Sequence, residues 1–424
     1  MVNQLIQQVR VIDPVAEVDQ VADVRVGSGQ ILELAAQLSQ DTQNSEEVID
    51  GRGKILFPGL VDLYSYSGEP GHESRETLAD LLAAGKAGGF TRLGVLPVAD
   101  PAIDNPAMVA DLLFRRDRLA QAQALPRLYP WGALTHGAQG ESMTELAELA
   151  EAGIVGFADG RPLHNTLLIR RLLEYAKPLG KPVGLWPCDR TLVGQGVARE
   201  GDYSLIYGLP GDPALSETVA LAALLEAVAE IGTPVHIMRL STARGVELVS
   251  QAKAAGLPVT ASTSWMHLLL NTADLKTYDP NLRVAPPLGN PADQAALITA
   301  VKEGRIDAIA VDHRAYTYEE KTVGFPSAPP GVLGLALVLP LLWQTFVASG
   351  QWSALTLLKR LSSGPATCWG QVPPNLKPRQ PVEMVLFDPE ATWEVSAASL
   401  KSPSANTPWL GKTLRGRVLS LWCE

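Results

Sequence analysis

The sequence predicts an α/β fold: a (β/α)8 TIM-type barrel with a small β-sheet domain formed by the N- and C-terminal segments. Three observations lead to this fold class. Eight short apolar runs alternate with helix-like stretches through the middle of the chain, strand-like segments occupy both ends, and 424 residues suffice for one barrel plus a smaller domain. We place a small composite β domain at residues 1–55 and 380–424 and the barrel at residues 56–379.

The N-terminal part of the chain is expected to form strands. Between residues 11 and 55, short segments rich in Val and Ile alternate with turns rich in Asp, Gly and Ser, which is typical of a small β unit. The barrel strands are then expected at eight apolar runs, at residues 60–66, 91–97, 127–133, 154–158, 182–187, 234–238, 257–262 and 306–312.

Amphipathic stretches separate these runs. Several are followed by glycine, which favours a helix C-terminus, as at residues 76–87, 218–231 and 243–255. Strand followed by helix, repeated eight times, is typical of a closed parallel barrel.

The last part of the chain returns to strands. A helical stretch is expected at residues 331–361, followed by strands at residues 382–388 and 414–421. We expect these two strands to share one sheet with the N-terminal strands.

The balance of charge argues against nucleic acid as a partner. The chain has 35 Lys and Arg against 45 Asp and Glu, a formal net charge of -10, and no basic run that could follow a phosphate backbone. The N-terminus has no basic segment followed by an apolar one, and the apolar run at residues 335–343 is interrupted by Pro340. We therefore expect neither a signal peptide nor a membrane span.

The cysteines carry no sign of a site. Cys188, Cys368 and Cys423 lie far apart and form no CxxC motif, so the sequence predicts neither a disulfide framework nor a thiolate zinc site. This pattern suits a reducing compartment, and we expect a cytoplasmic protein.

Residues 55–71 form the most informative motif, ILFPGLVDLYSYSGEPG. The motif resembles the first barrel strand of the dihydroorotases, whose pattern is Pro-Gly-x-x-Asp-x-His-x-His-x-Arg-Glu-Pro-Gly. In that family the two histidines bind zinc and the arginine holds a substrate carboxylate. The corresponding residues here are Tyr64, Tyr66 and Gly68.

Further segments resemble the same family in the expected order, at residues 285–288, 311–313, 320–321, 325–334 and 404–411. The resemblance covers nearly the whole chain, which is identified as a member of the dihydroorotase family of the amidohydrolase superfamily. It implies the barrel and the flanking sheet domain. In active members it also implies zinc at the C-terminal mouth of the barrel, where the metal activates water and polarises a cyclic amide.

The other metal-binding positions that the resemblance identifies are only partly kept. Trp186 stands in place of the histidine after strand five, and Arg239 in place of the second histidine after strand six. Asp312, after strand eight, keeps the family's metal-binding and proton-shuttling aspartate, and its neighbour His313 is expected to point away from it. Asp159 lies near the family's strand-four aspartate, but the chain is one residue shorter there, so its match to the bridging-carboxylate position stays open.

These replacements oppose zinc binding. Phenols are poor zinc ligands at neutral pH, an indole cannot accept a metal bond, and a permanently cationic guanidinium repels Zn²⁺. Substrate contacts change as well, because Val98 replaces an asparagine and Tyr316 a histidine of the family patterns. We therefore expect no zinc and no other cofactor, with Asp312 as a vestigial catalytic residue.

A missing cation would leave Asp312 buried without a partner, which is costly in free energy. We therefore predict that Arg239 lies within hydrogen-bonding reach of Asp312, Asp159 or both. The three aromatic residues at the former ligand positions are open to two interpretations. They fill the vacated space, or they form a ligand-binding pocket together with Arg239.

Three functions remain open. The first is a catalytically inactive dihydroorotase-like protein with a structural or regulatory role, for which the resemblance implies aspartate carbamoyltransferase of pyrimidine biosynthesis as the partner. The second is an active hydrolase of cyclic amide C–N bonds with an altered site, in which Asp312 carries the proton. The third is a metal-free sensor of an anionic metabolite, bound at a mouth lined by Tyr64, Tyr66, Trp186 and Arg239. The sequence also leaves a homo-oligomer open.

Overall fold

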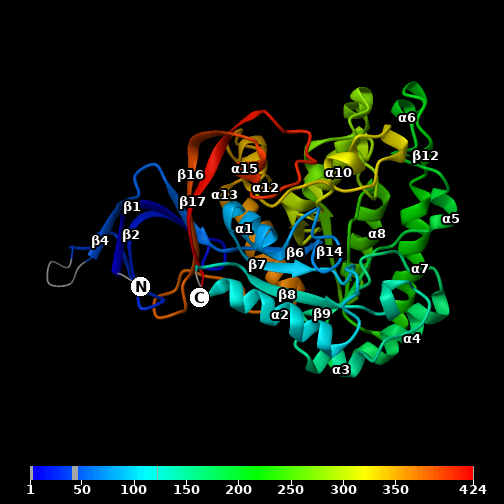
Figure 1. The fold of residues 1–424 in the computed structure, drawn as a ribbon, viewed down its shortest axis with the longest axis horizontal. Coiled ribbons are helices and arrows are strands. Elements are labelled where there is room, and N and C mark those ends of the chain that lie inside the picture. Colours follow the sequence, from blue (N-terminus) through cyan, green and yellow to red (C-terminus); the bar gives the residue numbers. More distant parts are fainter. Residues whose placement is uncertain (1–2, 41–45, 122, 424) are drawn as a thin grey trace.

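The computed structural model describes residues 3–40, 46–121 and 123–423. Eight parallel strands curl into a barrel, and a second sheet on one side contains strands from both ends of the chain (Figure 1). The predicted fold class, a (β/α)8 barrel with a small sheet domain from the termini, is confirmed. The residue bounds proposed for the two domains stay a prediction.

The barrel strands form where the apolar runs lie, because parallel strands buried on both faces need continuous apolar sequence. Their order in the sheet is β15-β14-β13-β10-β9-β8-β7-β6. All eight predicted strands are found: β6 (Leu60–Ser65), β7 (Phe90–Val95), β8 (Arg127–Gly132), β9 (Gly156–Phe157), β10 (Val183–Leu185), β13 (Val235–Ile237), β14 (Val259–Ser264) and β15 (Ala308–Ala310).

Two backbone hydrogen bonds join the segments that follow β15 to the end of β6. The Asp312 N–H donates to the Tyr64 carbonyl at 3.1 Å, and the Tyr66 N–H donates to the His313 carbonyl at 2.9 Å. The barrel is therefore closed beside residues that the sequence assigns to the site.

Helices alternate with the strands and surround the barrel (Figure 1). The longer ones are α1 (Leu78–Gly88), α2 (Pro106–Ala120), α3 (Leu146–Glu151), α4 (Thr166–Ala176), α7 (Leu215–Ile231), α8 (Ala243–Ala254) and α10 (Pro291–Glu303). Shorter turns of helix in the connections are η1 (His136–Ala138), η2 (Lys177–Leu179), α5 (Arg190–Val193), α6 (Asp202–Ile206), α9 (Trp265–Leu269), η3 (Thr272–Thr277), η4 (Pro280–Leu282), α11 (Tyr318–Lys321), η5 (Phe325–Ser327) and α15 (Ala397–Leu400).

Glycine lies at the end of all three helices for which the sequence predicts it, and Gly256, which follows the cap residue of α8, has φ 81°. Gly89 caps α1 with φ 84° and Gly232 caps α7 with φ 78°. Both are left-handed conformations that glycine adopts without steric cost. No helix in the described part of the chain is long and apolar enough to cross a membrane.

The stretch at residues 331–361 is helical only in part, which corrects the sequence prediction. Its first residues are not helical, and Val332 among them forms a β-bridge with His313. Two helical runs follow, separated by a turn at Gly350 with φ 78°. They are α12 (Val338–Leu342) with the π-helix η6 (Trp343–Val347), and α13 (Ala354–Leu358) with the π-helix η7 (Lys359–Ser363), which leads into α14 (Gly364–Cys368).

The second sheet has the order β17-β16-β5-β1-β2-β3, with β4 paired to β1, so N- and C-terminal strands share it as expected. Its strands are β1 (Asn3–Asp13), β2 (Val18–Gly27), β3 (Gln30–Ala35), β4 (Glu46–Asp50), β5 (Ile55–Pro58), β16 (Glu383–Glu394) and β17 (Thr413–Cys423). A separate pair, β11 (Ala198–Arg199) and β12 (Gly211–Asp212), has no sequence signal, because two-residue strands are too short to show a period.

A buried ion pair joins the two sheets. Arg92 on β7 donates to Glu383 on β16 through Nε and Nη2, both at 2.8 Å, and the Thr91 hydroxyl donates to the same carboxylate at 2.7 Å. All three residues are buried. Because Thr91 and Arg92 lie near the start of β7, this contact is at the opposite end of that strand from the barrel mouth.

Candidate functional site

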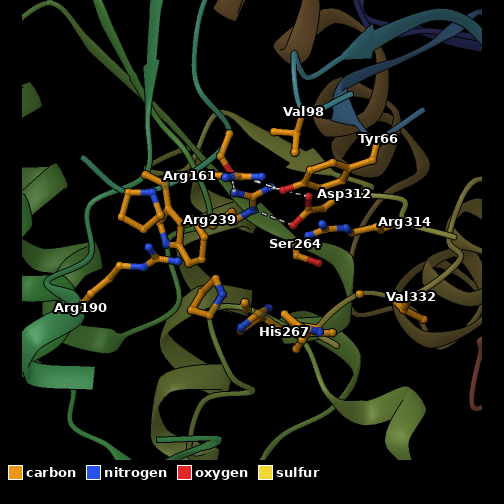
Figure 2. Close-up of a pocket in the computed structure, with 18 residues that line it drawn as sticks. Tyr66, Val98, Arg161, Arg190, Arg239, Ser264, His267, Asp312, Arg314 and Val332 are labelled. Carbon is orange, nitrogen blue, oxygen red and sulfur yellow. Dashed lines mark hydrogen bonds and ion pairs between the residues drawn. The ribbon is translucent and has the colours of Figure 1, made fainter. Parts of the chain in front are cut away.

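The C-terminal ends of the barrel strands carry the residues that the sequence singles out. Tyr64 and Tyr66 lie at the end of β6, Trp186 follows β10, Arg239 follows β13, and Asp312 follows β15. Side chains at this end of a parallel barrel converge on one mouth. The structure brings all of them together around the guanidinium of Arg239, and Figure 2 shows Tyr66 and Asp312 beside it.

Arg239 and Asp312 form a bidentate ion pair. Nε of Arg239 donates to Oδ2 of Asp312 and Nη2 donates to Oδ1, both at 2.7 Å. The Arg239 side chain is 1% exposed and that of Asp312 16%. Burial alone would lower the pKa of the Arg239 guanidinium, but the adjacent carboxylate outweighs burial and the net pKa is raised. The predicted contact between these two residues is confirmed.

The other edges and faces of the guanidinium are also occupied. Nη1 of Arg239 donates to the Gly160 carbonyl at 3.0 Å, and Nη2 donates to the Tyr66 hydroxyl at 2.8 Å. The Cζ atom lies 4.7 Å from the ring centre of Trp186, 5.3 Å from that of Tyr64 and 5.7 Å from that of Tyr66. Aromatic rings at such distances attract a cation. The aromatic residues therefore enclose a positive charge.

Tyr64 lies beneath Arg239. Its side chain is fully buried, and its hydroxyl accepts the Arg239 backbone N–H at 3.1 Å and contacts Ser262 Oγ at 2.9 Å. Ser262 Oγ in turn lies 2.8 Å from Nε2 of His236. Burial raises the pKa of the Tyr64 phenol and lowers that of His236 to about 3, so both groups are neutral at pH 7. An uncharged hydrogen-bonded chain thus supports the ion pair.

Both partners of the ion pair have unusual backbone conformations. The φ angle is 58° at Arg239 and 52° at Asp312. This left-handed region costs a residue with a side chain about 1 kcal/mol or more, and such residues cluster at functional sites, where surrounding contacts hold them. Here the ion pair and the bond to Tyr64 provide those contacts.

The carboxylate of Asp159 accepts hydrogen bonds from the loop after β8. Its Oδ1 accepts the N–H groups of Leu134 at 2.8 Å and Thr135 at 3.0 Å, and its Oδ2 accepts the Thr135 hydroxyl at 2.6 Å. Both oxygens therefore hold the loop after β8. Of the two partners predicted for Arg239 only Asp312 is found, and Arg239 instead reaches the carbonyl of Gly160.

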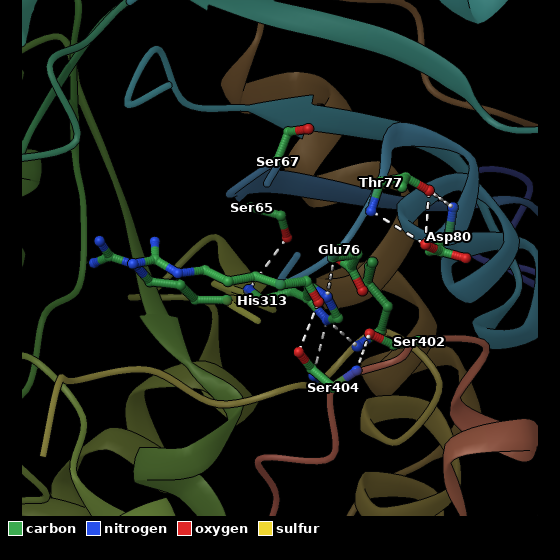
Figure 3. Close-up of polar contacts among 12 residues, drawn as sticks. Ser65, Ser67, Glu76, Thr77, Asp80, His313, Ser402 and Ser404 are labelled. Atoms are coloured by element: carbon green, nitrogen blue, oxygen red, sulfur yellow. Dashed lines mark hydrogen bonds and ion pairs between the residues drawn. The ribbon is translucent and has the colours of Figure 1, made fainter. Parts of the chain in front are cut away.

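His313 belongs to a separate buried pair (Figure 3). Its Nε2 lies 3.0 Å from Oε2 of Glu76, and its Nδ1 accepts the Gly334 N–H at 3.1 Å. Both ring nitrogens are therefore engaged away from Asp312. The prediction that these neighbours point apart is confirmed.

Gly68 occupies a position without room for a side chain. A Cβ atom there would lie 2.3 Å from the Glu76 carbonyl oxygen and 2.8 Å from the His72 carbonyl oxygen. The backbone of this chain thus excludes the arginine that the resemblance places at this position.

A pocket of about 300 Å³ opens at the mouth (Figure 2). Tyr66, Trp186, Arg239 and Asp312 line it, whereas Tyr64 lies outside its wall. The volume is at the lower end of the range for small-molecule sites. A ligand-binding role for these residues stays a prediction.

Three further arginines line the same pocket: Arg161, Arg190 and Arg314. Sequence reasoning missed them, although a signal exists. Arg161 lies in the loop after β9 and Arg190 at the start of α5 in the connection after β10, where barrel enzymes place functional residues. Arg314 is two residues beyond Asp312, a spacing that puts both side chains on one side of an extended segment.

We expect the Arg239→Met variant to unfold more easily, because it leaves the largely buried carboxylate of Asp312 without a partner. The loss in free energy of unfolding should be about 3 kcal/mol. Asp312→Asn should lose a similar amount, and the double variant should lose less than the sum of the two. Urea unfolding measures all three. Arg244→Met, at an exposed arginine of α8, is the matched control and should stay within about 0.5 kcal/mol of the parent. If the double variant lost as much free energy of unfolding as the two single variants together, Arg239 and Asp312 would not act as a pair.

A second prediction concerns His267, a buried pocket residue whose Nε2 lies 3.2 Å from the Pro287 carbonyl. Burial lowers the pKa of His267 from 6.5 to about 4. Between these values the unfolded chain holds more protons than the folded one, so this group lowers stability as the pH falls.

The His267→Gln variant should therefore lose stability less steeply than the parent from pH 6.5 down to pH 4. The difference in slope can reach about 1.4 kcal/mol per pH unit, and urea unfolding at a series of pH values measures it. His164→Gln, at an exposed position, controls for the loss of a histidine as such. If the free energy of unfolding fell in parallel with pH for the parent and for His267→Gln, protonation of His267 would not be the cause of the loss.

Comparisons with known proteins identify a family from the sequence and a fold from the structure. The family model described as Dihydro-orotase-like matches residues 53–244. A protein from Synechocystis sp. named "Probable dihydroorotase-like protein" is 42% identical over 99% of this chain and 99% of its own length. A dihydroorotase from Geobacter sp. is 37% identical over 98% of this chain and 97% of its own length. In fold, the chain is similar to the L-hydantoinase (dihydropyrimidinase) from Arthrobacter aurescens, with a TM-score of 0.85, 21% identity, and coverage of 100% of this chain and 97% of that one. The chain therefore belongs to the dihydroorotase-like family.

Proposed function

We propose that this protein is a non-hydrolytic member of the dihydroorotase-like family, with a structural or regulatory role that depends on binding. The observation that carries the proposal is the ion pair between Arg239 and Asp312. Both oxygens of Asp312 accept hydrogen bonds from one guanidinium at 2.7 Å. The aspartate that the resemblance assigns to metal binding and proton transfer thus already has a partner.

The residues at the mouth do not fit a zinc ion. Zinc sites use deprotonated nitrogen, oxygen or sulfur ligands, usually three or four from the protein. Among the residues that the structure describes, no group of three or more His, Cys, Asp or Glu side chains is placed to hold a metal ion. The fixed charge of Arg239 next to Asp312 would also repel a cation at contact distance.

The substrate side of the mouth supports the same proposal. Gly68 leaves no room for a side chain that could hold a carboxylate, and Val98 brings only an aliphatic group to the pocket wall. The barrel itself is complete and closed at its seam. The protein keeps this fold, but its own ion pair occupies the mouth. It is therefore suited to a role that depends on binding and not on hydrolysis.

An active hydrolase is the competing proposal, because the similar protein from Geobacter sp. is named dihydroorotase. Such an enzyme would cleave a cyclic amide C–N bond, with Asp312 moving the proton. Asp312 would first have to leave Arg239, which would break two charge-assisted hydrogen bonds in a buried site. The geometry therefore favours the non-hydrolytic proposal.

Metal analysis and an activity assay on one preparation test the proposal. The protein is purified from zinc-supplemented medium, and its metal content is measured by mass spectrometry. Hydrolysis of dihydroorotate and cyclisation of N-carbamoyl-L-aspartate are then followed with and without added Zn²⁺, with the Geobacter relative as positive control. We expect substoichiometric zinc and no turnover above that of Asp312→Asn. Stoichiometric zinc together with turnover that Asp312→Asn abolishes would overturn the proposal.

We further propose that the protein acts in the cytoplasm as a companion of aspartate carbamoyltransferase, the partner that the resemblance implies. Three exposed apolar side chains support a role in protein contacts. Leu205 and Ile206 on α6 are 80% and 70% exposed, and Leu215 at the start of α7 is 58% exposed. Exposed apolar groups of this size often mark protein interfaces when they lie together.

Size-exclusion chromatography with light scattering tests this companion role. A mixture with the carbamoyltransferase of the same organism should elute as one complex of higher mass, and the protein run alone shows whether it forms a homo-oligomer. Leu205→Glu should separate the two proteins, because it places a charge on the apolar surface. Phe114→Glu, at a position on α2 that is 61% exposed, should not. Separate elution of the unmodified proteins would refute the partnership.

A further inference from the structure

A groove runs along strand β17, away from the barrel mouth. Its volume is about 440 Å³, and none of the residues that line it lines the pocket at the mouth. Residues 416–421 of β17 form one side of the groove, and residues of α1, of α12 and of the segment around α15 form the others (Figure 1). Because β17 pairs only with β16, it is an edge strand of its sheet. The groove therefore borders a free sheet edge.

The backbone of β17 faces this groove. Side chains of consecutive strand residues alternate between the two faces of a sheet, so six consecutive lining residues mark the edge of the strand and not one face. An edge strand presents unpaired N–H and C=O groups. The Trp393 indole N–H donates to the Gly416 carbonyl at 2.8 Å. Within the described part of the chain, no group outside the pairing with β16 bonds to the backbone of residues 417–421. These edge groups are available to a second chain.

The lining of the groove is cationic. Lys86, Lys401 and Arg417 belong to it, and no Asp or Glu does. Lys86 Nζ donates to Gln123 Oε1 at 3.3 Å. The side chains of Lys401 and Arg417 are exposed and make no hydrogen bond or ion pair with any residue that the structure describes. Such a lining stands out in a chain whose formal net charge is -10.

Asp388 lies opposite Arg417 in the pairing of β16 with β17 but forms no ion pair with it in the described structure. Oδ1 of Asp388 instead accepts the N–H groups of Glu390 at 2.9 Å and Ala391 at 3.1 Å. The guanidinium of Arg417 is therefore open to an acceptor from another molecule.

Charge and length together indicate what occupies the groove. Six strand residues extend over about 17 Å, so a small anion would leave most of this edge uncovered. A second copy of the chain is disfavoured, because two molecules with a net charge of -10 repel each other, and the same charge disfavours a nucleic acid. An extended peptide that carries carboxylates suits both the cationic side chains and the free backbone groups.

We propose that this groove binds an extended acidic segment of a partner protein, with its backbone along β17 and its carboxylates near Lys401 and Arg417. Addition of a strand to a sheet edge is a recurring mode of peptide recognition. The register of β16 and β17 shifts at Leu419, and such a bulge disturbs the spacing of the edge groups. Contacts between charges must therefore supply much of the binding. This role goes beyond the proposed function, because it is independent of whether the barrel hydrolyses a substrate.

Fluorescence anisotropy of the full-length protein with a labelled octapeptide of alternating Glu and Thr tests the proposal. This peptide should bind saturably at one site per chain, and more weakly as sodium chloride is added. The matching octapeptide of Gln and Thr should bind at least about tenfold more weakly, because it offers no charged acceptor. A labelled oligothymidylate is the remaining probe. The proposal would be overturned if the acidic peptide did not bind, or if either of the other two probes bound as tightly.

Variants locate the site. Arg417→Gln and Lys401→Gln should each weaken binding of the acidic peptide by about threefold to fivefold, because each loses one exposed ion contact. Lys302→Gln, at an exposed lysine of α10 outside the groove, is the matched control and should bind as the parent does. Equal affinity in all three variants would show that the peptide binds elsewhere and would overturn the proposal. Arg417 and Lys401 lie on different segments, so one variant keeps the test valid if the other fails to fold.

Two further measurements separate this groove from other surfaces. Leu205→Glu, on α6, should bind the acidic peptide as the parent does, because α6 does not line the groove. Light scattering of the parent and of Arg417→Gln should give the same mass. A homo-oligomer that Arg417→Gln dissociates would identify a second copy of the chain as the occupant and overturn the assignment to an acidic partner segment.

Discussion

The positive charge of Arg239 must be balanced inside the barrel mouth, and the core of the site is arranged around this need. A guanidinium stays charged and carries five N–H donors, so a fully buried one requires acceptors on every edge. Asp312 supplies two, and the Gly160 carbonyl and the Tyr66 hydroxyl supply others. The ring of Trp186 packs against the same group. Where the resemblance implies a metal ion, the mouth holds a positive charge that the chain itself carries and cannot release.

The strand ends around this pair are held by other buried carboxylates. Asp62 accepts the Val311 N–H and the Ser65 hydroxyl, and Glu217 accepts N–H and hydroxyl groups of Ser241 and Thr242, just after Arg239. Burial raises the pKa of Asp62 to about 7 and also raises that of Glu217. Each carboxylate satisfies donors that a loop would otherwise bury unpaired. The order of the mouth therefore depends on side-chain hydrogen bonds within the protein.

The sequence predicts the barrel well and the site only in part, for a physical reason. Eight apolar runs are enough to predict eight strands, and a buried aspartate without its cation is enough to predict the contact between Arg239 and Asp312. The role of Asp159 depends on which loop N–H groups lie within reach of its oxygens, and no local pattern encodes that. Arg161 and Arg190 are missed for a similar reason, since their directions follow from loop conformations.

Tyr66 contacts both Arg239, whose charge Asp312 balances, and Arg314, another arginine that lines the pocket. Its hydroxyl accepts a hydrogen bond from Arg239 at 2.8 Å, while its ring lies 4.2 Å from the Cζ atom of Arg314. The resemblance assigns the position of Tyr66 to a zinc-binding histidine. Here the side chain contacts two guanidiniums, that of Arg239 through its hydroxyl and that of Arg314 through the face of its ring. A histidine carries no hydroxyl, and its shorter ring would not extend as far toward Arg239 as the Tyr66 side chain does. The tyrosine is therefore better explained as part of a rebuilt site than as a filler of empty space.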